Sequence, residues 1–212
     1  MLKWLDNFWY HNKWKVIISA FFIVVAIICT VQLFTRKNYD AQIIFVGNGG
    51  SIDGVQYNDI VKTFEEISTD VNGDGKVVVN FARETFLKSD DDMSAPLNSN
   101  ITSFMSTARL GDYFIFFIDP DLYEIYKGSG MFVTLEDKVG DIPDVMLYDE
   151  CAIKLEKCGF YELPGFSAIQ KDALIVLKEV PQSLGRKRSA EMEMYQAAHA
   201  EIIKKIVSYG IR

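Results

Sequence analysis

Three short groups of residues in the sequence have the types and spacing of metal, ligand or redox sites. In the first, Asp70, Asn72 and Asp74 occupy positions 1, 3 and 5 of a calcium loop. Glycine follows at position 6, and the Lys76 carbonyl stands at position 7. Position 12 is Phe81, where an EF-hand loop has a bidentate glutamate. Calcium binding is therefore one interpretation, and a polar helix-to-strand turn in which glycines take positive φ is the other.

The second group follows two apolar runs that read as buried strands. Gly47, Asn48, Gly49 and Ser51 come directly after QIIFV, but they lack the glycine spacing of a dinucleotide-binding or phosphate-binding loop, which favours a plain turn. Asp119 follows YFIFFI in the same way. Ligands of open α/β sheets bind outside the carboxyl ends of the strands. We therefore expect any small ligand to contact these five residues.

The third group is a pair of cysteines, Cys151 and Cys158, in a segment with glycine and proline that indicates extended or turn backbone. On a helix their spacing would separate them by about 10.5 Å along the axis, whereas a hairpin could bring them together. Outside the cytoplasm such a pair can oxidise, so a disulfide stays open. The two histidines, His11 and His199, stand beside no nucleophile motif and no set of zinc ligands. We therefore expect no catalysis.

These groups are carried by a chain whose first part has the composition of a membrane segment. Residues 16–34 contain no charged side chain, and at 1.5 Å per residue they can cross a hydrocarbon core about 30 Å thick. Trp4, Trp9 and Trp14 precede this run, as aromatic residues do at headgroup depth. We expect residues 4–34 to contact membrane lipid, with residues 16–34 as an uncleaved signal-anchor helix.

The distribution of charge predicts the orientation of this helix. Residues 1–37 carry five Lys or Arg and one Asp (+4), and residues 38–212 carry 17 basic and 28 acidic residues (−11), which gives the net charge of −7. The positive excess before the span favours a cytoplasmic tail at residues 1–15 and an extracytoplasmic domain at residues 38–212. An acidic domain of this kind is not expected to bind nucleic acid.

The pattern of residues 38–212 predicts one α/β domain. Buried strands are expected at 42–46, 76–81, 113–118 and 173–178, and an edge strand at 132–135. Amphipathic helices are expected after Asn58, over about 97–108, from Pro120, and over about 189–209. Alternation at this spacing is typical of a three-layer domain with a mostly parallel sheet.

The order of these segments resembles a known family. In chain order they read QIIFV, DVNGDGKVVVNF, ARLGDYFIFFIDPDLYEIYKGSGMFVTLED, ALIVLK and a terminal amphipathic helix. This order resembles the first lobe of type II extracellular (periplasmic) solute-binding proteins, over most of residues 42–136 and more weakly over 173–208. In that family a second lobe stands at the position of residues 138–172. These 35 residues are too few for a second lobe of about 100 residues.

The resemblance implies a lone solute-binding lobe on a membrane anchor. We therefore expect a non-enzymatic binding or interaction module whose partner is a protein at the membrane or envelope. The alternative is a reduced solute receptor that still presents a small solute to an ABC-type transporter. Because one lobe supplies only one wall, the ligand surface near Gly47 and Asp119 is expected to be shallow.

Overall fold

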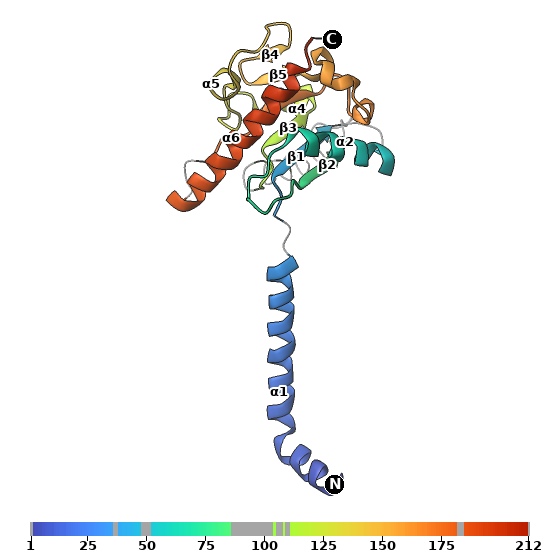
Figure 1. The fold of residues 1–212 in the computed structure, drawn as a ribbon. Helices are drawn as coiled ribbons and strands as arrows, with labels where there is room; N and C mark the ends of the chain where they lie inside the picture. The colour runs from blue at the N-terminus through green and yellow to red at the C-terminus, as the bar shows by residue number, and fades with distance from the viewer. Residues whose placement is uncertain are drawn as a thin grey trace, which may run out of the picture. The chain divides into compact units, whose positions relative to one another are not determined.

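The computed structural model describes residues 2–35, 38–47, 52–85, 104, 108, 111–181 and 185–211. The chain divides into two compact units, Met1–Asn38 and Tyr39–Arg212 (Figure 1). Each unit is described by itself.

The first unit is a single helix, α1 (Leu2–Thr35). Within it, Asn12–Val31 is long and apolar enough to cross a membrane. No part of this stretch is buried by the described chain, so it is not the core helix of a globular domain. The Thr30 hydroxyl donates to the Ala26 carbonyl at 2.7 Å, which satisfies this polar group inside the helix. Length and composition thus confirm a candidate membrane span near the N-terminus.

The second unit is built on one mixed sheet of six strands in the order β2-β1-β3-β6-β5-β4. The strands are β1 (Ala41–Gly47), β2 (Val79–Thr85), β3 (Ile115–Ile118), β4 (Leu147–Asp149), β5 (Ala152–Lys154) and β6 (Leu174–Leu177). β2, β1 and β3 are parallel, and each later neighbour pairs antiparallel. β5 therefore shares the direction of β3, and four of the six strands run the same way.

Helices cover both faces of this sheet, which confirms the α/β class (Figure 1). Along β1, Ile43 and Phe45 face a core shared with α2 (Gly54–Ile67) and α6 (Arg186–Ser208). Ile44 and Val46 face the opposite core, shared with α4 (Pro120–Tyr126). The short helix α5 (Leu135–Val139) follows α4. Ile43 to Val46 are buried on both faces of the sheet, and β1 lies between β2 and β3, as its apolar run predicts for a buried strand.

Several boundaries differ from the sequence-based expectation. Asp53 caps α2 in place of Asn58, because its carboxylate accepts the amides of Val55 and Gln56 while the Gln56 side chain accepts the Asp53 amide. The expected edge strand is reduced to a single bridge between Phe132 and Lys178. The expected helix near 97–108 lies outside the described residues, apart from two buried helical positions, 104 and 108.

Residues 138–172 do not build a second lobe. They form β4, β5 and the 3-10 turns η1 (Leu155–Lys157), η2 (Gly159–Glu162) and η3 (Phe166–Ala168), all within the same domain. In η2 the centroid of the Phe160 ring lies 4.5 Å from that of the Phe166 ring. The segment therefore completes the core and widens the sheet.

α6 is fixed to the sheet through a buried histidine. The Nδ1–H of His199 donates to the Tyr195 carbonyl at 2.6 Å, and its Nε2 accepts the Gln42 amide at 2.8 Å. Complete burial lowers the pKa of His199 to about 4, so the ring is neutral at physiological pH. His199 therefore joins α6 to β1.

Candidate functional site

The expected ligand residues Gly47 and Asp119 lie at the same edge of the sheet. Val46 pairs with Ile118, and the Asp119 amide donates to the Val46 carbonyl at 2.9 Å. The buried Asp119 carboxylate accepts the Asp121 amide at 2.9 Å and the Gln170 side-chain amide at 3.1 Å. It therefore caps α4 and holds the segment before β6.

Gly47 is required by packing at this edge. A Cβ atom at this position would lie 2.9 Å from the Phe45 ring and 3.1 Å from Gln170 Oε1. Three other expected ligand residues, Asn48, Gly49 and Ser51, lie outside the described residues.

The calcium-loop residues form a turn whose oxygens already accept backbone amides. The Asp70 carboxylate accepts the amides of Gly73 and Gly75 at 2.6 and 2.8 Å. Asn72 Oδ1 accepts the Asp74 amide, and Asp74 Oδ1 accepts the Lys76 amide, each at 2.9 Å. Gly73 and Gly75 have φ of 74° and 81°. Among the residues that the structure describes, no group of three or more His, Cys, Asp or Glu side chains could hold a metal ion.

A buried carboxylate that the sequence analysis did not identify holds this turn to the sheet. Asp40 is 1% exposed, and it accepts the amides of Val71, Asn72 and Val78 at 2.9 to 3.2 Å. It therefore joins the turn and the residue before β2 to the start of β1. The signal in the sequence was weak, because a single aspartate before a strand is common.

The two domain cysteines are free and lie in different surroundings. Cys158 is fully buried in the core beneath α2 and α6, and its thiol donates to the Lys154 carbonyl at 3.4 Å. Cys151 packs against the other core. Both lie on turn or extended backbone as expected, but the disulfide that the spacing left open is not formed.

The structure contains an open groove that the sequence analysis did not identify. Two depressions, of about 660 and 600 Å³, meet at Thr134, Asp149 and Glu150, beside the edge strand β4. The first is also lined by residues of α5 and of the loop before β4, namely Glu136, Gly140, Asp141, Ile142, Asp144 and Leu147. The second is also lined by Tyr123 of α4, by residues of the segment after α4 and by Cys151; the residues of that segment are Lys127, Gly128, Gly130, Met131 and Phe132. We call the two depressions together the β4 groove.

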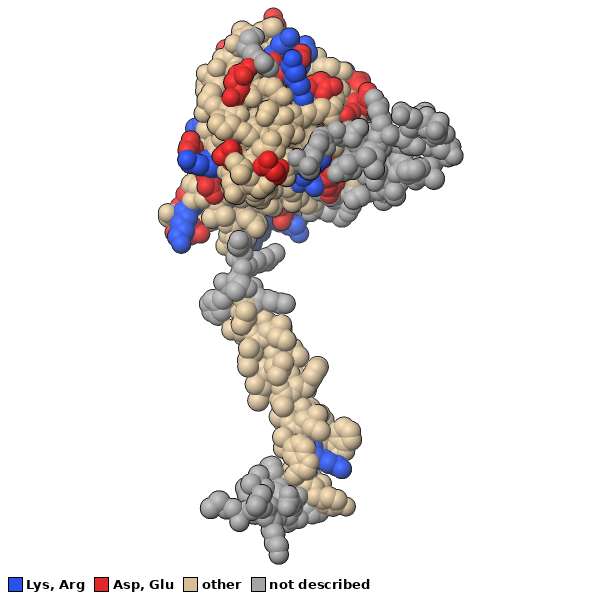
Figure 2. Space-filling model, turned by 90° about the vertical axis from the view of Figure 1, so that its right-hand side faces the viewer, with Lys and Arg blue, Asp and Glu red and all other residues tan. Residues whose placement is uncertain are grey.

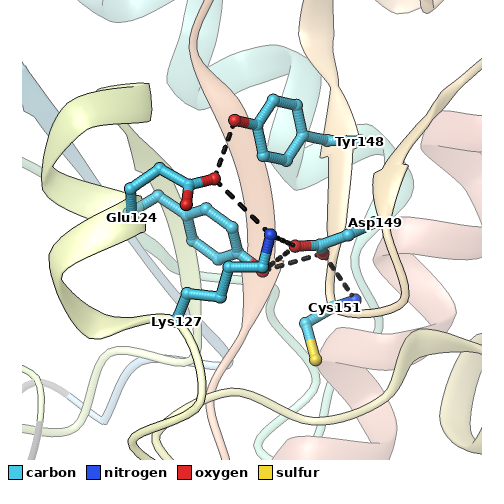
Figure 3. Close-up of polar contacts among 6 residues, drawn as sticks. Glu124, Lys127, Tyr148, Asp149 and Cys151 are labelled. Carbon is cyan, nitrogen blue, oxygen red and sulfur yellow. Dashed lines mark hydrogen bonds and ion pairs between the residues drawn. The ribbon is translucent and has the colours of Figure 1, made fainter.

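A polar network forms one wall of the β4 groove (Figure 3). Tyr123 and Lys127 lie one turn apart on and just after α4, so both side chains reach the Asp149 carboxylate at the end of β4. The Tyr123 hydroxyl donates at 2.8 Å, and the Lys127 ammonium lies 3.1 Å away. The Cys151 amide donates to the same carboxylate at 2.9 Å, while the Cys151 thiol points away from it.

This network changes the ionisation of its members. Partial burial raises the pKa of Asp149, but hydrogen bonds from the Cys151 amide, Tyr123 and Lys127 outweigh it and bring the pKa below its usual value. Burial and the adjacent Asp149 raise the pKa of Tyr123. Asp149 is therefore ionised and Tyr123 protonated at neutral pH. A fixed anion of this kind suits binding of a cation, and its low pKa does not suit a general base.

Acidic and basic side chains are interspersed over the described part of the face shown in Figure 2, without a continuous basic surface.

Comparison of the chain with protein-family models, curated proteins and solved structures finds no match.

Proposed function

We propose that the chain is a single-pass membrane protein whose domain outside the cytoplasm binds a protein partner at the membrane or envelope, without a catalytic step. The observation that carries this proposal is the division of the chain at residues 38 and 39. The residues before this division form an exposed apolar helix. The residues after it form a domain with a hydrophobic core on each face of its sheet. Such a helix is unstable in water and stable in a bilayer.

The orientation in this proposal rests on charge. Lys3, Lys13 and Lys15 precede the uncharged run at residues 16–34, and only Arg36 and Lys37 follow it closely. The side with more basic residues stays in the cytoplasm. The acidic domain is then the exported part.

The β4 groove is the surface that supports a binding role. It is open, and it combines apolar side chains with fixed charges, as protein-binding surfaces do. Its volume is within the range of ligand sites.

The second candidate is a reduced solute receptor of an ABC-type transporter, which would use the edge near Gly47 and Asp119. The observation that favours it is the juxtaposition of these residues at the carboxyl ends of β1 and β3. Asp119, however, already binds Asp121 and Gln170 within the chain. Tight binding of a small solute by the full chain would favour this candidate over the first.

Topology is tested by labelling single cysteines with a membrane-impermeant maleimide on intact cells. The background combines Cys29→Ser and Cys151→Ser, which leaves Cys158, a buried residue, as the remaining native cysteine. Glu65→Cys on the exposed face of α2 should react at once, and Lys3→Cys should react only after the cells are permeabilised. The reverse pattern would contradict the proposed orientation.

A further inference from the structure

The β4 groove has an apolar interior with further apolar side chains at its rim. Ile142 and Leu147 line one depression, and Met131 and Phe132 line the other. Removing apolar side chains from water is favourable, so a ligand that covers these residues gains binding free energy from their burial.

Two large apolar side chains that adjoin groove-lining residues in the chain are exposed to solvent. Val145 follows Asp144, and Tyr148 follows Leu147 on β4; their exposed fractions are 46% and 39%. Apolar side chains grouped in this way beside a groove are typical of a surface that another molecule covers.

The charges of the groove are strongly unequal. Its lining contains five carboxylates and one ammonium, that of Lys127. Asp149 is paired with Lys127. In the described part of the chain, no ion pair or side-chain hydrogen bond neutralises the other four carboxylates, which belong to Glu136, Asp141, Asp144 and Glu150. A cationic occupant would complement them.

Lys127 shows how this surface holds a cation. Its ammonium lies 3.1 Å from Asp149, 3.6 Å from Glu124 and 5.7 Å from the centroid of the Tyr148 ring. Carboxylates together with an aromatic face are an established environment for a lysine or arginine side chain. Further carboxylates, those of Glu136, Asp141 and Asp144, line the other depression of the groove.

We infer that the β4 groove binds an extended segment of a partner protein in which lysine or arginine alternates with apolar residues. The apolar side chains would cover Ile142, Leu147 and Val145, and the cations would pair with Glu136, Asp141 and Asp144. This inference rests on the proposed function, because it names the partner surface that the binding module fits.

The test uses the full chain in nanodiscs of zwitterionic phosphatidylcholine, to which a cationic peptide binds weakly. The probe is a short fluorescent peptide of alternating lysine and leucine, and its counterpart has glutamate in place of lysine. The groove variant combines Glu136→Gln, Asp141→Asn and Asp144→Asn. The control variant combines Glu65→Gln, Glu66→Gln and Asp172→Asn, which removes the same charge from exposed positions outside the groove.

We expect the lysine peptide to bind the natural chain and the control variant equally, and to bind the groove variant about tenfold more weakly. The glutamate peptide should not bind. Equal weakening in both variants, unchanged binding in the groove variant, or no binding of the lysine peptide would overturn the inference. Circular dichroism of the variants confirms that each is folded. The labelling of Glu65→Cys and Lys3→Cys tests the topology separately, so a failure here leaves the membrane orientation untouched.

Discussion

The Tyr123 hydroxyl lies 2.8 and 2.9 Å from the two carboxylate oxygens of Asp149, 26 residues further along the chain. This contact joins α4 to the edge strand β4 across the wall of the β4 groove. The ring of Tyr123 is 1% exposed, while its hydroxyl reaches an ionised carboxylate. The groove therefore has a rigid wall that is anchored in the core.

Replacing Tyr123 with phenylalanine should lower the free energy of unfolding by about 2 kcal/mol, because a hydrogen bond to a charged group is lost. The pKa of Asp149 should rise, because one of the groups that lowers it is removed. Chemical denaturation of the full chain in detergent measures the first effect. Tyr148→Phe is the matched control: this more exposed ring donates to Glu124 at the surface, and its loss should cost less than about 0.5 kcal/mol. Equal losses of unfolding free energy in the two variants would contradict the stabilising role given to the hydrogen bond between Tyr123 and Asp149.

His199 predicts a loss of stability in mild acid. Its pKa is about 4 in the folded protein against 6.5 ordinarily, so the unfolded chain takes up a proton between these pH values and the folded chain does not. Stability should therefore fall by up to about 3 kcal/mol as the pH decreases from 7 to 4. The variant His199→Gln should show a smaller decrease over the same range. An unchanged pH dependence in that variant would show that other groups cause it.

The turn at residues 70–76 should be stable without calcium. Asp70→Ala, measured in the presence of a chelator, should lower the free energy of unfolding by about 1 to 2 kcal/mol, since two backbone amides lose their acceptor. If instead millimolar calcium raises the melting temperature and Asp74→Ala abolishes the increase, the loop binds the ion through Asp70, Asn72, Asp74 and the Lys76 carbonyl.

The two domain thiols should differ in reactivity. Cys158 is fully buried, and burial raises its pKa to about 12, so iodoacetamide should modify it only after unfolding. Cys151 is partly exposed with a raised pKa and should react slowly in the folded protein. Peptide mass spectrometry measures both rates. A linked peptide containing both residues, released only by reduction, would show that the disulfide forms after all.

The elements that could be predicted from the sequence are those fixed by local pattern. The apolar runs of β1, β3 and β6 identify buried strands, and Asp119-Pro120 identifies the start of α4. Gly47 and Asp119 could be placed at one edge because parallel strands end together. The antiparallel pairing of β6 could not be predicted, because an apolar run has the same composition in either direction.

The β4 groove could not be predicted because its residues become neighbours only in the folded chain. Tyr123 and Asp149 belong to separate elements, and nothing local pairs a buried tyrosine with a carboxylate 26 residues away. The strands β4 and β5 have three residues each and no clear alternation. Asp149 ends β4, and the only local role that its residue type indicates is to accept an amide of the following turn, as it does from Cys151.

The most direct test of the central claim places a photoreactive benzoylphenylalanine at the groove rim in intact cells that naturally make the chain. Val145 is the test position, and Val55 at the start of α2 is the matched exposed control. The account predicts a protein adduct from position 145, severalfold less of it when Glu136→Gln, Asp141→Asn and Asp144→Asn are also present, and none from position 55. Adducts of equal yield at both positions, or an adduct at 145 that the three substitutions leave unchanged, would contradict it.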